Sequence, residues 1–503
     1  GVQTCALPIF AFDPSNSNRV LCGNDGGLQV CNNIMENSAT PSVTEPVSWT
    51  VIANYQTLQY YHVAMDPGSQ RNNFIGGAQD NGTRFRDGTG LVGSPAAGNT
   101  QYRLLSGDGG AAAIAKTNGT SQIVYGSTQF GNIIRANLSP SGATGGSIRP
   151  NGLTATPGLS GSYGDFVTYF KIDFDNTEDL YYVNFNRLFR TTNASTTTAS
   201  GWTELTGVGT AINPTKPTTG TDITITALEM SRGDYAASHV LYIGTSDGKV
   251  LRLNNPRNAA ANQAPSNITP TQLKGYISDI AVNPNNDAEI MVTLSNYTFN
   301  SSPVTNIFWT NNAKDASPTW YGLDGNLSTA SFRSCMIVVK KDANNNPVTE
   351  YYAGTSVGLY SLVNVSSLVQ SGNYNWAREG GAVLNYAVIT SMDYRPQDNV
   401  MLIGTHGNGM YYTALSGSPD FRPNQNTGIN DPVRNDKKFI QKVYPTVVDD
   451  RIRYQTGELF TVKKLIIKIF TTNGQLIAQK ETGYASGEMD TRRLARGTYF
   501  LTI

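Results

Sequence analysis

The sequence contains very little cysteine and histidine. Only four cysteines and three histidines occur among its 503 residues, and none of them has the spacing of a zinc site. We therefore expect no metal and no other cofactor. A chain with so few cysteines, punctuated instead by Gly, Asn, Ser and Thr, suits a secreted bacterial protein that does not depend on disulfides.

An excess of either charge is also missing. Lys and Arg together number 37, as do Asp and Glu, and charged residues make up 15% of the chain. Without a basic surface, nothing favours nucleic acid or an anionic membrane as a partner. No apolar run approaches the length needed to cross a bilayer, so we expect no membrane-spanning segment.

What the chain does contain is one short phrase, repeated along most of its length. Each copy is an apolar run, a glycine-rich turn and a second apolar run, as in Val20–Gly23 followed by Gly27–Val30. The copies follow one another at intervals of roughly 50 to 60 residues, which is typical of an array of identical supersecondary units. Equivalent positions in the eight copies are Gly23, Gly76, Gly126, Val183, Gly244, Val292, Gly354 and Gly404.

Each repeat predicts four strands. The phrase itself is a hairpin, because two β-rich runs flank a turn of Gly, Asn or Asp. Most copies have an apolar run upstream, and a short extended segment with a tryptophan often lies downstream. These tryptophans are Trp49, Trp202, Trp320 and Trp376. Four-stranded units in radial repetition are the blades of a β-propeller, so we predict an all-β chain with seven or eight blades, in a complete or incomplete ring, over residues 10–415.

The two ends of the chain differ from this pattern. Residues 1–9 resemble a translated sequencing adapter, and we expect them not to belong to the protein. Residues 416–438, rich in Ser, Pro, Asn and Gly, read as a linker. Residues 439–503 then alternate strands and turns, which predicts a second domain, a small β-sandwich.

This C-terminal segment carries three recognisable phrases, in order. It opens with Tyr444-Pro445, continues through a hairpin with Gly474-Gln475, and ends on a strand with Gly497 and Tyr499. Together they resemble the type A C-terminal sorting domain of the type IX secretion system of Bacteroidota, which we expect to be truncated at its end here. The resemblance implies the secretion machinery as a partner and a location outside the cell or on the outer-membrane surface. The alternative is an ordinary β-sandwich of a binding module.

The propeller also resembles a family. The phrases His62–Pro67, Gly76–Thr83 and Leu105–Gly110 are similar to secreted propellers of the same bacteria that carry BNR-like repeats and are often labelled glycosyl-hydrolase-like. These are distantly related to xyloglucan-cleaving enzymes built from two propellers. The resemblance implies carbohydrate as a ligand or substrate.

Hydrolysis of a glycosidic bond needs two carboxyl groups that face each other across the sugar. The candidates are Asp25, Asp80 and Asp108, all in glycine-rich turns. The alternative is turn chemistry, because Asp tolerates the left-handed conformation and caps its own backbone.

Three further residues are candidates for binding. His406 lies in a glycine-rich hairpin turn, and Trp309 and Trp320 could stack on sugar rings. Aromatic residues in repeats also form the cores of blades. Two functions stay open: a secreted or surface-attached propeller that binds a glycan or a protein through loops on one face, and a fragment of a two-propeller glycoside hydrolase.

Overall fold

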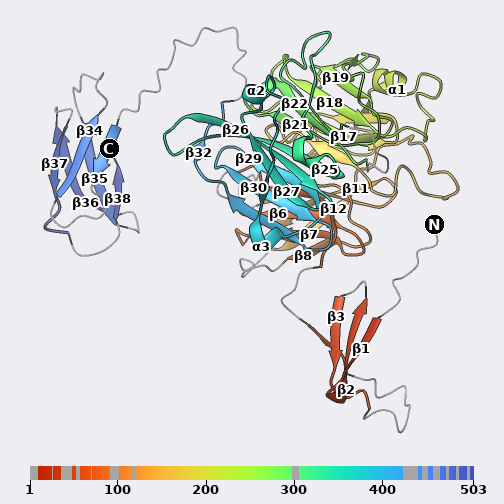
Figure 1. The fold of residues 1–503 in the computed structure, drawn as a ribbon, viewed down its shortest axis with the longest axis horizontal. Helices are drawn as coiled ribbons and strands as arrows, with labels where there is room; N and C mark the ends of the chain where they lie inside the picture. Colours follow the sequence, from red (N-terminus) through yellow and green to blue (C-terminus); the bar gives the residue numbers. More distant parts are fainter. Residues whose placement is uncertain are drawn as a thin grey trace. The chain divides into compact units, whose positions relative to one another are not determined.

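The computed structural model describes residues 9–24, 27–35, 48–52, 57–68, 71–90, 101–115, 121–296, 305–422, 440–444, 451–456, 465–471, 475–482, 486–494 and 499–502. Contacts divide the chain into two compact units, Gly1–Asn426 and Thr427–Ile503 (Figure 1). Both units are built almost entirely from antiparallel strands.

Seven sheets follow one another between Tyr60 and Ala414, and we number them as blades 1 to 7. Blade 1 comprises β5 (Tyr60–Met65), β6 (Phe74–Ala78), β7 (Gly82–Arg86) and β8 (Tyr102–Leu105). Blade 2 comprises β9 (Ala112–Ile114), β10 (Gln122–Thr128), β11 (Asn132–Ser139) and β12 (Gly142–Ser147). Blade 3 comprises β13 (Phe170–Ile172), β14 (Leu180–Asn184), β15 (Arg187–Thr191) and β16 (Thr203–Glu204). Blade 4 comprises β17 (Ile225–Met230), β18 (Val240–Thr245), β19 (Val250–Asn254) and β20 (Ser266–Asn267).

The remaining blades complete the series (Figure 1). Blade 5 comprises β21 (Ile277–Asn283), β22 (Asn286–Leu294), β23 (Ile307–Thr310) and β24 (Tyr321–Gly322). Blade 6 comprises β25 (Phe332–Lys341), β26 (Pro347–Thr355), β27 (Gly358–Val363) and β28 (Ala377–Glu379), with β32 (Ser418–Pro419) paired to β25. Blade 7 comprises β29 (Ile389–Arg395), β30 (Val400–Thr405) and β31 (Met410–Ala414). The connections carry the short helices α1 (Thr206–Ile212), η1 (Gly325–Leu327), α2 (Val365–Leu368) and α3 (Gly381–Leu384).

The seven blades close into a ring. The first strand of each blade contacts the first strand of the next, and β29 of blade 7 contacts β5 of blade 1. Arg395 stabilises this junction, because its Nη1 donates hydrogen bonds to the carbonyl oxygens of Asp66 and Arg71, both at 2.7 Å. The predicted propeller is confirmed, and seven of the eight repeats form the ring.

Adjacent blades are joined by the predicted tryptophans. The indole N–H of Trp202 donates to Ile148 O at 2.8 Å, that of Trp320 to Ile268 O at 3.0 Å, and that of Trp376 to Leu323 O at 2.8 Å. Each acceptor lies just after the last strand of the preceding blade. The tryptophan immediately before the fourth strand therefore bonds one blade to its neighbour and fills the apolar space between them.

The first repeat forms a sheet of its own. It comprises β1 (Ile9–Asp13), β2 (Asn16–Asn24), β3 (Gly27–Cys31) and β4 (Thr50–Val51), paired in that order. Its large apolar side chains are exposed, among them Ile9 at 76%, Phe12 at 64% and Val51 at 65%. The ring closes without this sheet.

The second unit contains two three-stranded sheets. One consists of β33 (Ile440–Tyr444), β34 (Arg451–Thr456) and β37 (Ser486–Asp490), and the other of β36 (Leu476–Thr482), β35 (Leu465–Thr471) and β38 (Tyr499–Thr502). Ile467, Ile469 and Met489 are its buried apolar residues among those described. The unit has the two-sheet architecture that the sequence predicts.

Candidate functional site

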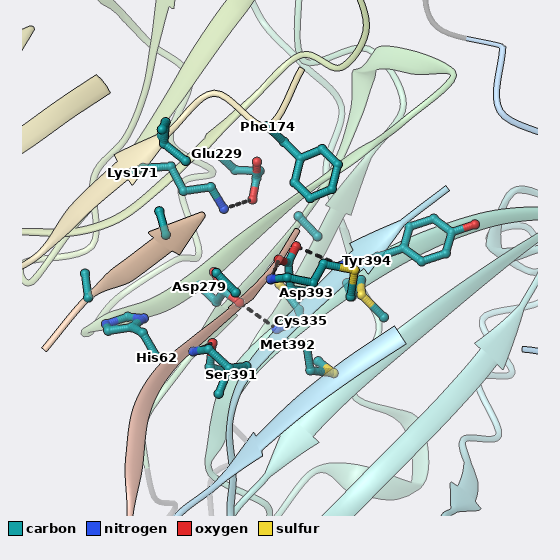
Figure 2. A pocket seen from close by; sticks show the side chains of 18 of the residues that line it. His62, Lys171, Phe174, Glu229, Asp279, Cys335, Ser391, Met392, Asp393 and Tyr394 are labelled. Atoms are coloured by element: carbon teal, nitrogen blue, oxygen red, sulfur yellow. Dashed lines mark hydrogen bonds and ion pairs between the residues drawn. The ribbon is translucent and has the colours of Figure 1, made fainter. Parts of the chain in front are cut away.

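The seven inner strands surround a central channel. We call the face at which these strands begin the upper face, and the face at which they end the lower face. A cavity of about 150 Å³ in the channel is lined by residues from all seven inner strands (Figure 2). Channels and the loops around them are where propellers present side chains to a ligand.

A shared irregularity shapes the upper end of this channel. Five inner strands contain a register shift near their first residue, in β5, β17, β21, β25 and β29. The residues left without a partner in the register are Tyr61, Thr226, Ser278, Arg333 and Thr390. All five are polar. Four of the five, Thr226, Ser278, Arg333 and Thr390, line the channel, whereas the Tyr61 hydroxyl donates to Gln79 Oε1 within blade 1 at 2.9 Å. Because a bulge re-aims the side chain of its extra residue, the upper end of the channel carries polar groups from four blades.

The middle of the channel carries charges that are paired. Lys171 Nζ lies 2.6 Å from Glu229 Oε2, and Figure 2 shows the two side chains pointing toward each other. Burial lowers the pKa of Lys171, but Glu229, Tyr169 and Asp393 together outweigh this effect, and the net pKa of the amine is raised. The pair joins blade 3 to blade 4.

Two further carboxyl groups join neighbouring blades through the backbone. Asp279 Oδ2 accepts from the Cys335 N–H of blade 6 at 2.9 Å, as Figure 2 shows, and Asp393 Oδ2 accepts from the Met65 N–H of blade 1 at 2.8 Å. Burial raises the pKa of Asp279 to about 7 and also raises the pKa of Asp393. The two carboxyl groups therefore link blade 5 to blade 6 and blade 7 to blade 1 within the channel.

His62 also lines the channel, near Lys171, but it carries no charge at neutral pH. Burial lowers its pKa to about 4, and the ammonium of Lys171 adds to this effect. Its imidazole packs against Tyr169, with ring centroids 5.1 Å apart. At neutral pH the ring is therefore uncharged.

A second cavity, of about 360 Å³, opens at the upper face beside the channel, and we call it the upper pocket. It is lined by segments that lead into β13, β17 and β21, and it shares His62, Tyr169 and Thr226 with the channel. Two aromatic side chains of its lining are exposed, Phe166 at 40% and Tyr276 at 46%. Its volume falls within the range of pockets for small ligands.

The lower end of the channel is occupied by a packed ion pair. Arg232 Nε lies 2.9 Å from Asp175 Oδ2, and the guanidinium lies 4.3 Å from the centre of the Phe174 ring. Phe421, which follows β32, places its ring 5.7 Å from the same guanidinium. The upper end is thus the more open side for a ligand.

The predicted catalytic residues lie in turns of blade 1 or outside the described residues. Asp108, 6% exposed, accepts the backbone N–H of Asp80 through Oδ1 at 2.8 Å. Asp80 itself has a φ of 56°, in the left-handed region. The Asp108 carboxylate therefore supports the hairpin turn between β6 and β7, in which Asp80 is the middle residue. Asp25 lies outside the described residues, and the catalytic role of all three stays a prediction.

The predicted binding residues are dispersed. His406 is exposed on the upper face, where it forms an isolated bridge with Gln59. Trp309 is 1% exposed and donates its indole N–H to Glu289 Oε1 at 3.1 Å, while Trp320 is half-buried between blades. His406 alone is placed to meet a ligand at the upper face.

The predicted sorting residues lie in the second unit. Tyr444 ends β33 and Tyr499 begins β38. Gln475, in the turn between β35 and β36, donates its backbone N–H to Thr471 Oγ1 at 3.1 Å. Pro445, Gly474 and Gly497 lie outside the described residues.

Sequence reasoning missed the channel residues Lys171, Glu229 and Asp279, and the pocket residue Asp165. The signal was present, since each of the three channel residues stands in an apolar run that predicts a buried strand. Alternation along a strand would place such a residue toward solvent. Only the closed ring converts those positions into the lining of a channel.

Two further findings concern the described part of the chain alone. Within it, no three His, Cys, Asp or Glu side chains are grouped in a way that could hold a metal ion. Nor does any helix there have the length and apolarity required to span a membrane.

Comparison with known proteins identifies the C-terminal unit. Residues 442–503 match the family described as secretion system C-terminal sorting domain. A comparison with curated proteins gave no match. Among solved structures, the chain is similar to YCF48 from Cyanidioschyzon merolae, with 12% sequence identity, a TM-score of 0.43, and coverage of 73% of this chain and 98% of that chain. The sorting domain indicates a secreted, cell-surface protein that the type IX secretion machinery handles.

Proposed function

We propose that this secreted propeller binds a glycan or a protein at the upper face of its ring, without catalysis. The observation that carries the proposal is the set of four bulge residues, Thr226, Ser278, Arg333 and Thr390, whose polar side chains line the upper end of the channel. The upper pocket adds exposed aromatic rings beside them. Binding residues concentrate where loops converge on a rigid scaffold, and this face combines both features.

The difference between the two faces supports this assignment. At the lower end, Arg232 is held by Asp175 and covered by Phe174 and Phe421. At the upper end, Arg333 lies at a bulge and His406 is exposed. A ligand at the upper face would meet a cation, an imidazole and hydroxyl groups.

The test compares variants of the two faces. The full chain would be applied to glycan and peptide microarrays, together with Arg333→Ala and His406→Ala at the upper face. Asn344→Ala, in an exposed lower-face turn, is the matched control. We expect Asn344→Ala to bind like the wild type and the upper-face variants to bind at least about tenfold more weakly. Binding lost in the control but kept in both upper-face variants would place the ligand elsewhere.

The second candidate function is glycoside hydrolysis, with Asp108 as a catalytic acid. The observation in its favour is the number of carboxyl groups in blade 1 and the channel, one of which, Asp279, has a pKa of about 7. Against it, Asp108 and Asp279 both accept backbone N–H groups that hold the fold. Asp108→Asn in a chain assayed on β-glucans tests this candidate, since unchanged hydrolysis removes Asp108 from it.

The finer family assignment is also part of the proposal. The phrases that begin at His62 and Gly76 support membership of the BNR-like, glycosyl-hydrolase-like propellers of Bacteroidota. The sorting domain supports attachment to the cell surface, which would display the upper face to polymers outside the cell.

A further inference from the structure

We infer that the upper pocket is a binding site for one ring of a neutral sugar polymer. This inference rests on the proposed function and specifies its ligand. It is carried by three observations: the single carboxylate in the pocket lining, the exposed aromatic rings, and a buried hydroxyl group for which the described part of the chain supplies no hydrogen-bond partner.

The first observation concerns charge. Among the residues that line the pocket, Asp165 is the one acidic side chain and none is Lys or Arg, while His62 is uncharged at neutral pH; burial raises the pKa of Asp165 above its usual value. Asp165 also bonds with the Thr224 side chain. Arg333, in the lining of the adjoining channel, acts electrostatically on Tyr276, but the charged group in the lining of the pocket itself is the Asp165 carboxylate. This carboxylate disfavours anionic ligands such as uronic acids, sulfated sugars and phosphates. The same carboxylate is a strong acceptor for the hydroxyl groups of a neutral sugar.

The second observation concerns shape and apolar surface. Phe166 packs edge-on against Phe130, with ring centroids 5.4 Å apart, which holds it in place while 40% of it stays exposed. Tyr276 follows Gly275, whose φ of 121° turns the chain sharply at that point. Half-exposed aromatic rings offer a large flat contact, and the packing of Phe166 against Phe130 lowers the conformational entropy that this ring would lose on binding. The apolar face of a sugar ring matches such a surface.

The third observation, an unpaired hydroxyl group, favours a sugar over a cation as the ligand. Thr226 Oγ1 is buried and has no hydrogen-bond partner among the described residues. Thr226 is the extra residue of the bulge in β17, and it lines both the pocket and the channel. A hydroxyl group without a partner costs free energy that a ligand can recover. Asp165 only accepts and Thr226 can donate, so a ligand that both donates and accepts satisfies the two together. A sugar hydroxyl does this, whereas an ammonium group only donates.

The volume limits the length of the ligand that the pocket encloses. About 360 Å³ is at the lower end of small-ligand pockets, which suits one sugar ring rather than a folded protein surface. The polymer would continue across the upper face toward the hydroxyl groups of Ser278 and Thr390, which line the mouth of the channel.

Affinity electrophoresis of the full chain tests the inference. The probes are xyloglucan, glucomannan, laminarin and xylan as neutral polymers, polygalacturonate as an anionic polymer, and polylysine as a cation. The variants are Tyr276→Ala, Asp165→Asn and Thr226→Val. Tyr386→Ala is the matched control, because Tyr386 is 66% exposed but does not line the pocket.

We expect at least one neutral polymer to retard the wild type, and the control to be retarded equally. Each pocket variant should bind that polymer about tenfold more weakly, which corresponds to one lost hydrogen bond or stacking contact. Thr226→Val is decisive, since it removes only the unpartnered hydroxyl and should leave the melting temperature unchanged or higher.

The remaining outcomes distinguish the two proposals. Neutral-polymer binding that survives all three pocket variants but is lost in Arg333→Ala overturns the pocket and leaves the upper face as the site. Retardation by polygalacturonate or polylysine alone overturns the sugar assignment. A chain that no neutral polymer retards, yet whose upper-face variants lose binding to a peptide array, contradicts this inference and keeps the proposed function.

Discussion

Glu289 should be among the most sensitive positions of the ring. Its side chain is 7% exposed, and it accepts three hydrogen bonds. Asn283 Nδ2 donates to Oε2 at 2.8 Å, while Trp309 Nε1 donates to Oε1 at 3.1 Å and the Tyr351 hydroxyl donates to the same oxygen. Because Tyr351 lies on β26, this carboxylate connects blade 5 to blade 6.

Glu289→Ala would leave three buried donors without an acceptor. Each such group costs about 1 to 3 kcal/mol, and the costs are not fully additive, so we expect the free energy of unfolding to fall by about 3 to 5 kcal/mol. Glu289→Gln keeps an oxygen for Trp309 and Tyr351, and its amide nitrogen would face Asn283. We expect that variant to lose only about 1 to 2 kcal/mol.

The assay is urea-induced unfolding of the full chain, followed by tryptophan fluorescence and supported by calorimetry. Asp234→Ala, at an exposed turn, is the control and should change stability by less than about 0.5 kcal/mol. The reasoning is refuted if Glu289→Ala unfolds at the same urea concentration as the control, or if Glu289→Gln is as damaging as Glu289→Ala.

Three other predictions concern the joints of the ring. Trp376→Phe keeps most of the indole's volume but leaves the Leu323 carbonyl unpaired, so calorimetry should show a loss of about 1 to 2 kcal/mol, and an unchanged transition would contradict the role of the indole N–H. Arg395→Met removes the donor to the Asp66 and Arg71 carbonyls, so amide hydrogen exchange should rise first in β5 and β29. A uniform rise across all blades would argue against a local role of Arg395 at the junction of blades 1 and 7. The pKa of Asp279 is raised to about 7 by burial, so the folded chain keeps this proton between about pH 4 and 7 while the unfolded chain loses it, and stability from this group falls as pH rises through that range. Asp279→Asn should reduce this fall, measured as urea midpoints at pH 5 and pH 8, and a slope equal to that of the wild type would contradict the assignment.

The sequence predicts the blades well because their signals are local. Glycine turns fix each hairpin, and the tryptophans mark the outer strands of blades 3, 5 and 6, with Trp202, Trp320 and Trp376 all bonded to the preceding blade. The place of the first repeat could not be predicted, since its phrase matches those of the ring. Ring closure depends on contacts between β29 and β5, more than three hundred residues apart.

The candidate site is far less visible in the sequence. Thr226 and Arg333 line the channel because they lie at bulges, and the sequence of a single strand does not predict a shift in register. Asp165 lies in a loop whose neighbours come from other blades. Asp108, in contrast, stands out in the sequence because it precedes two glycines, and the structure uses it to support a turn.

The central claim is that a ligand binds at the upper face. Amide hydrogen exchange, measured with and without a polymer that retards the chain in affinity electrophoresis, tests it most directly. If the ligand binds at the upper face, amides in residues 163–169, 224–226 and 274–276 should exchange more slowly in its presence. The lower-face turns at 173–179 and 283–286 should be unchanged. Protection confined to those lower turns, or protection nowhere in the ring, would contradict the account.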